Sequence, residues 1–201
     1  MVFGRGAAAR VAVEAAGLTD GDRVVDVGCG PGTAVREAAR HGAAAAGVDP
    51  SAASLSLARW ISARRKARDV TWLAGRAENL PLPDASATVV WALSSLHHWA
   101  DRGAGFAEAR RVLTPGGRLL IAERLVKQGG RGLARHGLTR DQAGQRAGEI
   151  AAAGFTGIRT QTRRAGRRVL IIIQATTAPH PPPPGLGSHV PSSKIINRKC
   201  P

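Results

Sequence analysis

The chain has 201 residues, of which 43% are hydrophobic and 21% are charged, a size and balance typical of one folded domain with its own core. No apolar run approaches the roughly 20 residues that a membrane-spanning helix needs, and the first residues lack the apolar centre of a secretory signal. With only two cysteines, Cys29 and Cys200, the composition excludes a disulfide framework. We therefore expect a cytoplasmic protein without a membrane partner.

The formal net charge of +15 indicates either a surface that binds polyanions or an incidental excess of arginine. Only four of the 29 basic residues are lysines, while alanine, glycine and arginine dominate throughout, as a coding sequence rich in G and C would produce. Aromatic side chains that stack on bases are scarce and are not interleaved with the arginine clusters. We favour a solvated basic surface, with nucleic acid as a less favoured partner.

Short apolar runs alternate with helix-like segments from residue 24 onward, a pattern typical of a parallel sheet covered by helices on both faces. The predicted strands lie at 24–28, 44–49, 70–74, 87–93 and 117–123. The predicted helices lie at 5–16, 32–41, 51–66, 103–113 and 139–153. We expect Ser51 or Asp49 to cap the third helix in this order, and Thr139 to cap the last one.

The C-terminal region changes character after Gly154, the predicted end of the last helix. Residues 155–162 and 168–176 predict two strands joined by a short turn, which makes a hairpin rather than another crossover. From residue 179 the proline-rich, basic sequence buries too little apolar surface to offset the entropy of ordering. We therefore predict one domain over residues 1–178 and a disordered tail over 179–201.

A glycine turn, VVDVGCGPG, joins the first predicted strand to the following helix. Glycines at such a turn let the backbone approach a ligand closely, beside the free N–H groups of the helix. The match to a dinucleotide-binding loop is imperfect, because Thr33 stands in place of the third glycine. Asp26 would be unfavourable beside a pyrophosphate and favourable beside an ammonium group, so the turn points to a ligand that carries an amino group.

Asp49 ends the next predicted strand. A carboxylate at the carboxyl end of that strand can accept hydrogen bonds from two neighbouring ribose hydroxyls. Asp49 can also cap the helix that follows, and the two roles are compatible. Asp26 and Asp49 together predict a ligand with an amino group at one end and a ribose at the other.

The sequence resembles the class I S-adenosylmethionine-dependent methyltransferases, in particular their small-molecule branch of the methyltransferase type 11 kind. The resemblance rests on four blocks in chain order: VVDVGCGPG, GVDPS, LAGRAENLPLPDASATVVWALSSLHHWAD and EARRVLTPGGRLLIAE. It covers residues 24–120 and extends more loosely to residue 176. The resemblance implies an α/β fold: a doubly wound, Rossmann-like, seven-stranded sheet, mostly parallel with an antiparallel C-terminal hairpin, and helices on both faces.

The resemblance also implies a site for S-adenosylmethionine. Asp26 would contact the ammonium group of the cofactor and Asp49 its ribose, while Pro50 would pack on the adenine and Ala77 would offer its backbone amide to the ring. Arg76 departs from the family pattern, because many members carry an acid there that accepts from the adenine amino group. The expected cofactor-binding residues are Asp26, Gly28, Cys29, Gly30, Asp49, Pro50, Ala77, Glu78 and Leu93.

His97 and His98 follow the fourth predicted strand, at the sheet edge where open α/β sheets bind ligands. An OH, NH or acidic CH acceptor must lose a proton, and histidine is the natural base near neutral pH. We expect His97 or His98 to be that catalytic base; the alternative is a structural histidine. Trp99 and Asp101 are expected to contact the substrate. Adjacent side chains rarely point at one ion, so we predict no metal site.

The resemblance implies methyl transfer to an O, N or C atom of a small-molecule acceptor. Residues 92–95 lack the N/D-P-P-aromatic block with which many amino-group methylases of nucleic acids hold a planar amine. Two alternatives stay open: an RNA or protein methyltransferase that uses the basic surface, and a protein that binds S-adenosylmethionine without catalysis. Arg76 favours the second, as does the glycine-rich segment VKQGGRGLARHG, which follows the predicted strand 117–123 where family members usually carry a longer lid. A homodimer is also open.

Overall fold

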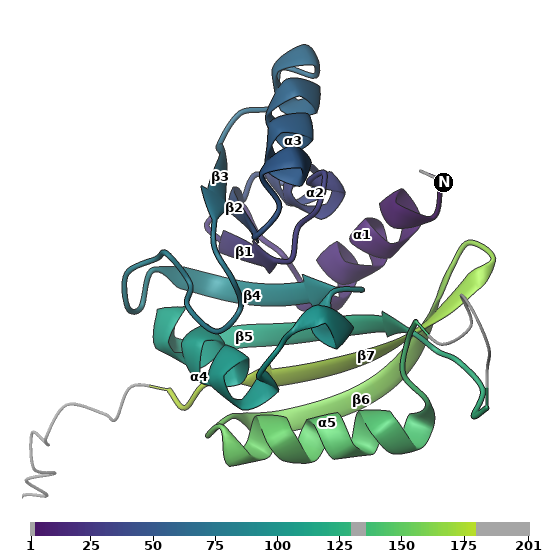
Figure 1. Cartoon of the computed structure of the whole chain (residues 1–201). Coiled ribbons are helices and arrows are strands. Elements are labelled where there is room, and N and C mark those ends of the chain that lie inside the picture. The colour runs from purple at the N-terminus through teal and green to yellow at the C-terminus, as the bar shows by residue number, and fades with distance from the viewer. Residues whose placement is uncertain (1–2, 130–135, 180–201) are drawn as a thin grey trace, which may run out of the picture.

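The computed structural model describes residues 3–129 and 136–179 (Figure 1). Its strands are β1 (Arg23–Val27), β2 (Ala44–Asp49), β3 (Val70–Ala74), β4 (Ala87–Leu93), β5 (Leu113–Arg124), β6 (Thr156–Ala165) and β7 (Arg168–Thr176). Its helices are α1 (Phe3–Ala16), α2 (Thr33–Arg40), α3 (Ala52–Arg64), α4 (Arg102–Val112) and α5 (Arg140–Ala152), with a short 3-10 helix, η1 (Leu96–His98).

The strands form one seven-stranded sheet in the order β3-β2-β1-β4-β5-β7-β6. The pairs from β3 to β5 are parallel, whereas β7 is antiparallel to both β5 and β6. This confirms the predicted doubly wound sheet with its C-terminal hairpin. The chain order reverses between β1 and β4, and such a switch point opens a crevice at the carboxyl ends of the two strands.

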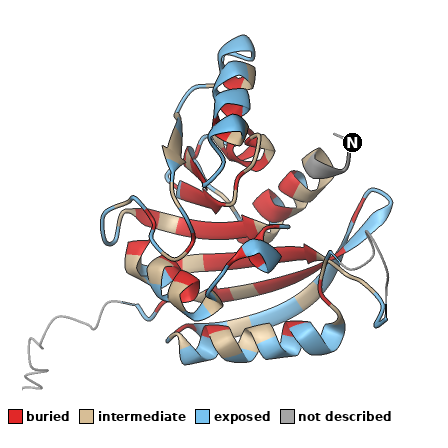
Figure 2. Ribbon diagram, in the orientation of Figure 1, coloured by how far each residue is buried: buried red, intermediate tan, exposed pale blue. Residues whose placement is uncertain are grey.

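Hydrophobic cores lie on both faces of the sheet, as Figure 2 shows by the buried segments of strands and helices. One core joins the sheet to α1, α2 and α3, and the other joins it to α4 and α5. In β4, Val89 and Trp91 belong to the first core and Val90 and Ala92 to the second, because successive side chains of a strand point to opposite faces. A strand buried on both faces carries a continuous apolar run rather than an alternating one.

The predicted helix caps are confirmed. Ser51 accepts a hydrogen bond from the N–H of Ser54 and so is the N-cap of α3. Thr139 and Gln142 form a capping box at the start of α5, which satisfies two N–H groups that the first turn would leave unpaired. Gly154 follows the end of α5 with a φ of 87°, a left-handed conformation typical of the residue after a helix.

Strand β5 begins at Leu113, four residues before the predicted start at 117. Residues 114–116, Thr-Pro-Gly, precede the predicted strand, but the ladder with β4 contains an irregularity there: Ala87 pairs with Leu113 and Val89 with Arg118. The N–H of Thr177 also donates to the carbonyl of Gly117. These contacts hold the segment in the sheet, so its turn residues produce a bulge instead of a strand end.

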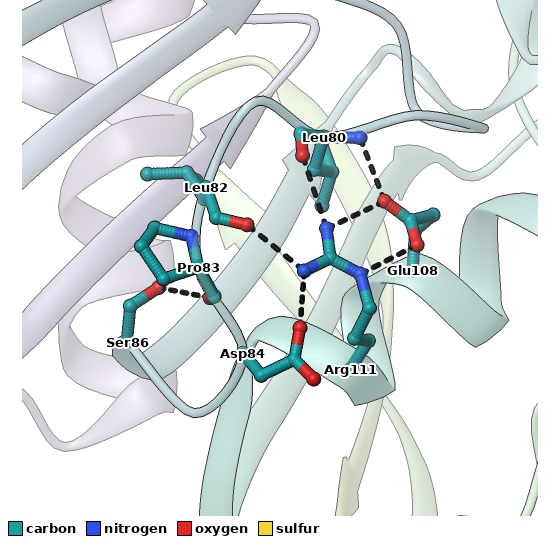
Figure 3. A network of polar contacts seen from close by, with 7 residues as sticks. All are labelled: Leu80, Leu82, Pro83, Asp84, Ser86, Glu108 and Arg111. Atoms are coloured by element: carbon teal, nitrogen blue, oxygen red, sulfur yellow. Dashed lines mark hydrogen bonds and ion pairs between the residues drawn. The ribbon is translucent and has the colours of Figure 1, made fainter.

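The loop between β3 and β4 is fixed to α4 by Arg111 (Figure 3). Its guanidinium donates to the carbonyls of Leu80 and Leu82, at 3.0 and 2.9 Å, and pairs with Asp84 and Glu108, each at 2.7 Å. Glu108 in turn accepts from the N–H of Leu80 at 2.8 Å. Because this loop begins beside the crevice, the network fixes one wall of the candidate site.

In the two described ranges, no helix is both long enough and apolar enough to cross a bilayer. Residues 180–201, nearly all of the predicted tail, lie outside the described residues, so the predicted domain boundary at 178 stays a prediction.

Candidate functional site

The glycine turn after β1 has a conformation and a spacing that require glycine. Gly28, Gly30 and Gly32 have φ values of 77°, 52° and 74°, which side chains other than glycine rarely adopt. The N–H of Gly28 donates to the carbonyl of Val48 at 2.8 Å. A Cβ atom on Gly28 would lie 2.5 Å from Cβ of Ser95. The turn thus brings the backbone after β1 against the segment that follows β4.

Asp49 links the glycine turn to the start of α3. Its side chain is buried, and its two oxygens accept from the N–H of Gly30 at 2.8 Å and from the N–H of Ser51 at 2.9 Å. The helix cap itself is Ser51, so capping is not the role of Asp49. Each carboxylate oxygen can accept more than one hydrogen bond, and Asp49 therefore keeps capacity for two ligand hydroxyls.

Asp26 is buried near the carboxyl end of β1, with 2% of its surface exposed. Burial, with the neighbouring charge of Asp49, raises the pKa of Asp26 to about 7, although the Trp91 side chain acts in the opposite direction. No salt bridge within the described residues involves Asp26. Because an unpaired buried carboxylate is costly, this position suits a ligand that brings its own cation.

Two cavities meet at the glycine turn. The first, of about 300 Å³, is lined by residues that include Asp49, Pro50, Ala77 and Glu78. The second, of about 370 Å³, is lined by residues that include Asp26, Cys29, Leu93, His97, His98 and Glu123. They share Gly28, Gly30, Ser94 and His98. The structure therefore gathers all nine predicted cofactor-binding residues around one crevice, with Asp49 in one half and Asp26 in the other.

His97 and His98 lie in η1, directly after β4. Nδ1 of His97 is 3.4 Å from Oε1 of Glu123, a carboxylate at the end of β5 with 1% of its side chain exposed. The Glu123 carboxylate raises the pKa of His97, whereas burial and the neighbouring His97 lower the pKa of His98. In the tautomer that carries its proton on Nδ1, this nitrogen donates to Glu123 and Nε2 of His97 is the basic nitrogen.

The two predicted substrate residues lie apart from the second cavity. Trp99 lines the first cavity and packs on Phe106, with ring centroids 5.5 Å apart. Asp101 lines neither cavity, and its side chain caps α4 by accepting from the N–H of Ala104 at 3.1 Å. The geometry places Trp99 in the half of the crevice that contains Asp49 and gives Asp101 a role in holding the helix.

Glu78 and Cys29 also have local roles. Glu78 accepts from the N–H groups of Ala100 and Asp101 at 2.7 and 3.1 Å; burial raises its pKa, but these backbone donors leave it below the ordinary value. Burial raises the pKa of the Cys29 thiol, and the charge of Asp26 adds to this, which makes the thiol a poor nucleophile. Among the described residues, no three His, Cys, Asp or Glu side chains are grouped so that they could hold a metal ion.

Sequence reasoning missed Glu123, and it did not predict the contact that Ser95 makes with β1. Glu123 stands at the end of the predicted strand 117–123, and the rule that singled out Asp49, a carboxylate at the carboxyl end of a parallel strand, applies to it equally. Ser95 carries no such signal: its hydroxyl donates to the carbonyl of Val27 at 2.6 Å, a contact that depends on the neighbouring order of β1 and β4.

A doubly wound sheet with a glycine turn after β1 and an acid at the end of β2 is typical of α/β domains that bind nucleotides. Residues 25–121 match the family model described as a methyltransferase domain.

Relatives that are named methyltransferases match about half of the chain, and a solved structure shares its fold. The chain is 40% identical over 111 residues to 27-O-demethylrifamycin SV methyltransferase of Amycolatopsis mediterranei, covering 54% of this chain and 41% of that protein. It is 36% identical over 114 residues to demethylmenaquinone methyltransferase of Tropheryma whipplei, covering 57% and 46%. The chain therefore spans less than half the length of these relatives. A crystal structure of a SAM dependent methyltransferase from Aquifex aeolicus shares the fold, with a TM-score of 0.71 at 18% identity, covering 85% of this chain and 89% of that one.

Proposed function

We propose that this chain is an S-adenosylmethionine-dependent methyltransferase that acts on an O, N or C atom of a small-molecule acceptor. The observation that carries the proposal is the placement of two buried carboxylates, Asp26 and Asp49, in the two halves of one crevice, with the glycine turn between them. The family match and the small-molecule relatives support the same activity.

The residues of the crevice fit the cofactor. Asp26 would pair with its ammonium group and Asp49 would accept from its ribose hydroxyls, while Pro50 would border the adenine. Arg76 lacks the acceptor expected at its position, but Glu78 lines the same cavity and supplies a carboxylate in its place. When bound, S-adenosylmethionine supplies a methyl group activated by its sulfonium.

His97 is the proposed base. Glu123 holds Nδ1 of the ring, so Nε2 can take the proton that the acceptor atom loses as it forms its bond to the methyl carbon. His98 lines both cavities. Among the described residues it has no carboxylate partner comparable to Glu123, so it is the second candidate for the base. Methyl transfer depends largely on alignment of the acceptor with the carbon-sulfur bond, and the walls of the second cavity would supply that alignment.

The proposal is tested in two steps on the whole chain. Calorimetry with S-adenosylhomocysteine first measures cofactor binding, and labelled methyl transfer is then measured with separate metabolite, RNA and protein fractions. Transfer into the metabolite fraction is the expected result, and incorporation into RNA or protein would favour the alternative acceptors. Binding without transfer to any fraction would favour a non-catalytic protein. Cytoplasmic location and homodimer formation stay predictions, which cell fractionation and sedimentation test.

A further inference from the structure

A third cavity, of about 570 Å³, adjoins the site where β5 ends, α5 begins and β6 turns into β7. We call it the basic cavity, because its charged lining residues are five cations and one acid: Arg124, Lys127, Arg140, Arg167, Arg168 and Asp141. Such a concentration of one sign of charge in a concave surface attracts anions and raises their local concentration.

Four of the five cations in the basic cavity have no acidic partner among the described residues, as is also true of exposed arginines such as Arg65 and Arg68. In the ranges that the structure describes, no salt bridge involves Lys127, Arg140, Arg167 or Arg168. By contrast, Arg111 pairs with Asp84 and Glu108, and Arg102 and Arg118 each pair with one acid. What distinguishes the basic cavity is that its cations line one concave surface together with a single acid.

The basic cavity borders the proposed acceptor site. Arg124 and Arg168 line both the basic cavity and the second cavity, the one that contains His97, Glu123 and Asp26. Arg140, Arg167 and Lys127 line only the basic cavity, so they lie outside the second cavity, which contains Asp26. A molecule that reaches from the base to the basic cavity passes Arg124 and Arg168.

We propose that the methyl acceptor is an anion, whose carboxylate or phosphate group is held in the basic cavity while its reacting atom lies at His97. This inference rests on the proposed function, since it assigns the acceptor to the second cavity. Guanidinium groups bind carboxylate and phosphate oxygens through paired, charge-assisted hydrogen bonds. An uncharged analogue would leave the cations without an anionic partner and would therefore bind more weakly.

The test uses the whole chain saturated with S-adenosylhomocysteine and three small probes: benzoate, phenyl phosphate and benzamide, which is the uncharged isostere of benzoate. Affinities are measured by NMR titration at low ionic strength, because salt screens exposed charges. We expect at least one anion to bind about tenfold or more tightly than benzamide, since one charge-assisted hydrogen bond contributes about that factor. Benzoate and phenyl phosphate then distinguish a carboxylate from a phosphate acceptor.

Two matched double variants locate the effect. Arg140→Gln/Arg168→Gln should remove the preference for anions, whereas Arg65→Gln/Arg68→Gln, which removes two exposed charges that line none of the three cavities, should retain it. The proposal would be overturned if benzamide bound as tightly as benzoate and phenyl phosphate, or if both double variants lost the preference for anions equally. So would competition between the anions and S-adenosylhomocysteine, because the arginines would then hold the carboxylate of the cofactor. Failure to bind S-adenosylhomocysteine at all would refute the proposed function instead, and the probe preference can still be measured on the free protein.

Discussion

Nδ1 of His97 lies 3.4 Å from Oε1 of Glu123, although 26 residues separate them in the chain. The contact follows from the parallel pairing of β4 with β5, in which Leu93 is opposite Ala122. Glu123 follows Ala122 directly and His97 comes four residues after Leu93, so both side chains lie at the same edge of the sheet. Glu123 also accepts from the N–H of Leu96 at 3.0 Å, so it fixes the turn that carries His97 as well as its ring.

Glu123→Gln should lower the pKa of His97, because the carboxylate is the main cause of its raised value. A base acts when it is neutral, so the rate of the wild-type enzyme should rise with pH through the raised pKa of His97. In the variant this rise should move to lower pH. NMR titration of the imidazole measures the pKa without any acceptor, and the pH profile of methyl transfer measures its consequence.

The matched histidine variants separate the two candidate bases. His97→Gln should lower methyl transfer by about 100-fold or more, the usual contribution of a general base, whereas His98→Gln should retain the pH profile. If Glu123→Gln leaves the pKa of His97 unchanged, Glu123 does not act on the ring. If His98→Gln alone removes the pH-dependent rise, the assignment of the base is wrong.

The elements that sequence reasoning predicted best are those whose signal is local. The caps at Ser51 and Thr139, the glycine turn and the apolar run of β4 each depend on a few neighbouring residues. The start of β5 was missed because the pairing of Leu113 with Ala87 overrides the local turn residues. Glu123 carried a local signal, its place at the end of a predicted strand, but its contact with His97 exists only once β4 and β5 lie side by side.

Asp49→Ala should weaken S-adenosylhomocysteine binding by about 100-fold, because two hydrogen bonds to a charged group are lost at roughly 1.5 kcal/mol each. Asp49→Asn should lose less, since its amide oxygen can still accept one hydrogen bond. Asp20→Ala, at an exposed acid that lines neither half of the crevice, is the control and should bind as the wild type does. Calorimetry measures all three, and unchanged affinity in Asp49→Ala would refute the ribose assignment.

Binding of S-adenosylhomocysteine should depend on the ionisation of Asp26. With its pKa raised to about 7 in the free protein, the carboxyl is largely protonated at pH 6 and must lose its proton to pair with the ammonium of the ligand. Affinity should therefore fall as the pH falls from 7.5 to 5.5, by up to about tenfold per pH unit. Calorimetry across this range measures the slope.

Two controls test whether this slope belongs to Asp26. Methylthioadenosine lacks the amino-acid portion, so its affinity should vary little with pH. Asp26→Asn cannot ionise and should bind S-adenosylhomocysteine more weakly, with a flat profile. The same slope in Asp26→Asn would assign the pH dependence to another group.

Gly28→Ala should both destabilise the fold and weaken cofactor binding. The new Cβ would be 2.5 Å from Cβ of Ser95, and the φ of 77° is strained for alanine, so we expect a loss of about 1–3 kcal/mol in the free energy of unfolding. Relief of the strain by backbone movement would displace the turn and lower affinity for S-adenosylhomocysteine.

Gly144→Ala is the matched control: this glycine lies within α5, and a Cβ added to it would have no neighbouring atom within 4 Å, so alanine should stabilise the helix by about 0.5–1 kcal/mol. Urea unfolding and calorimetry measure both effects, and a Gly28→Ala protein with wild-type stability and affinity would show that the turn tolerates a side chain.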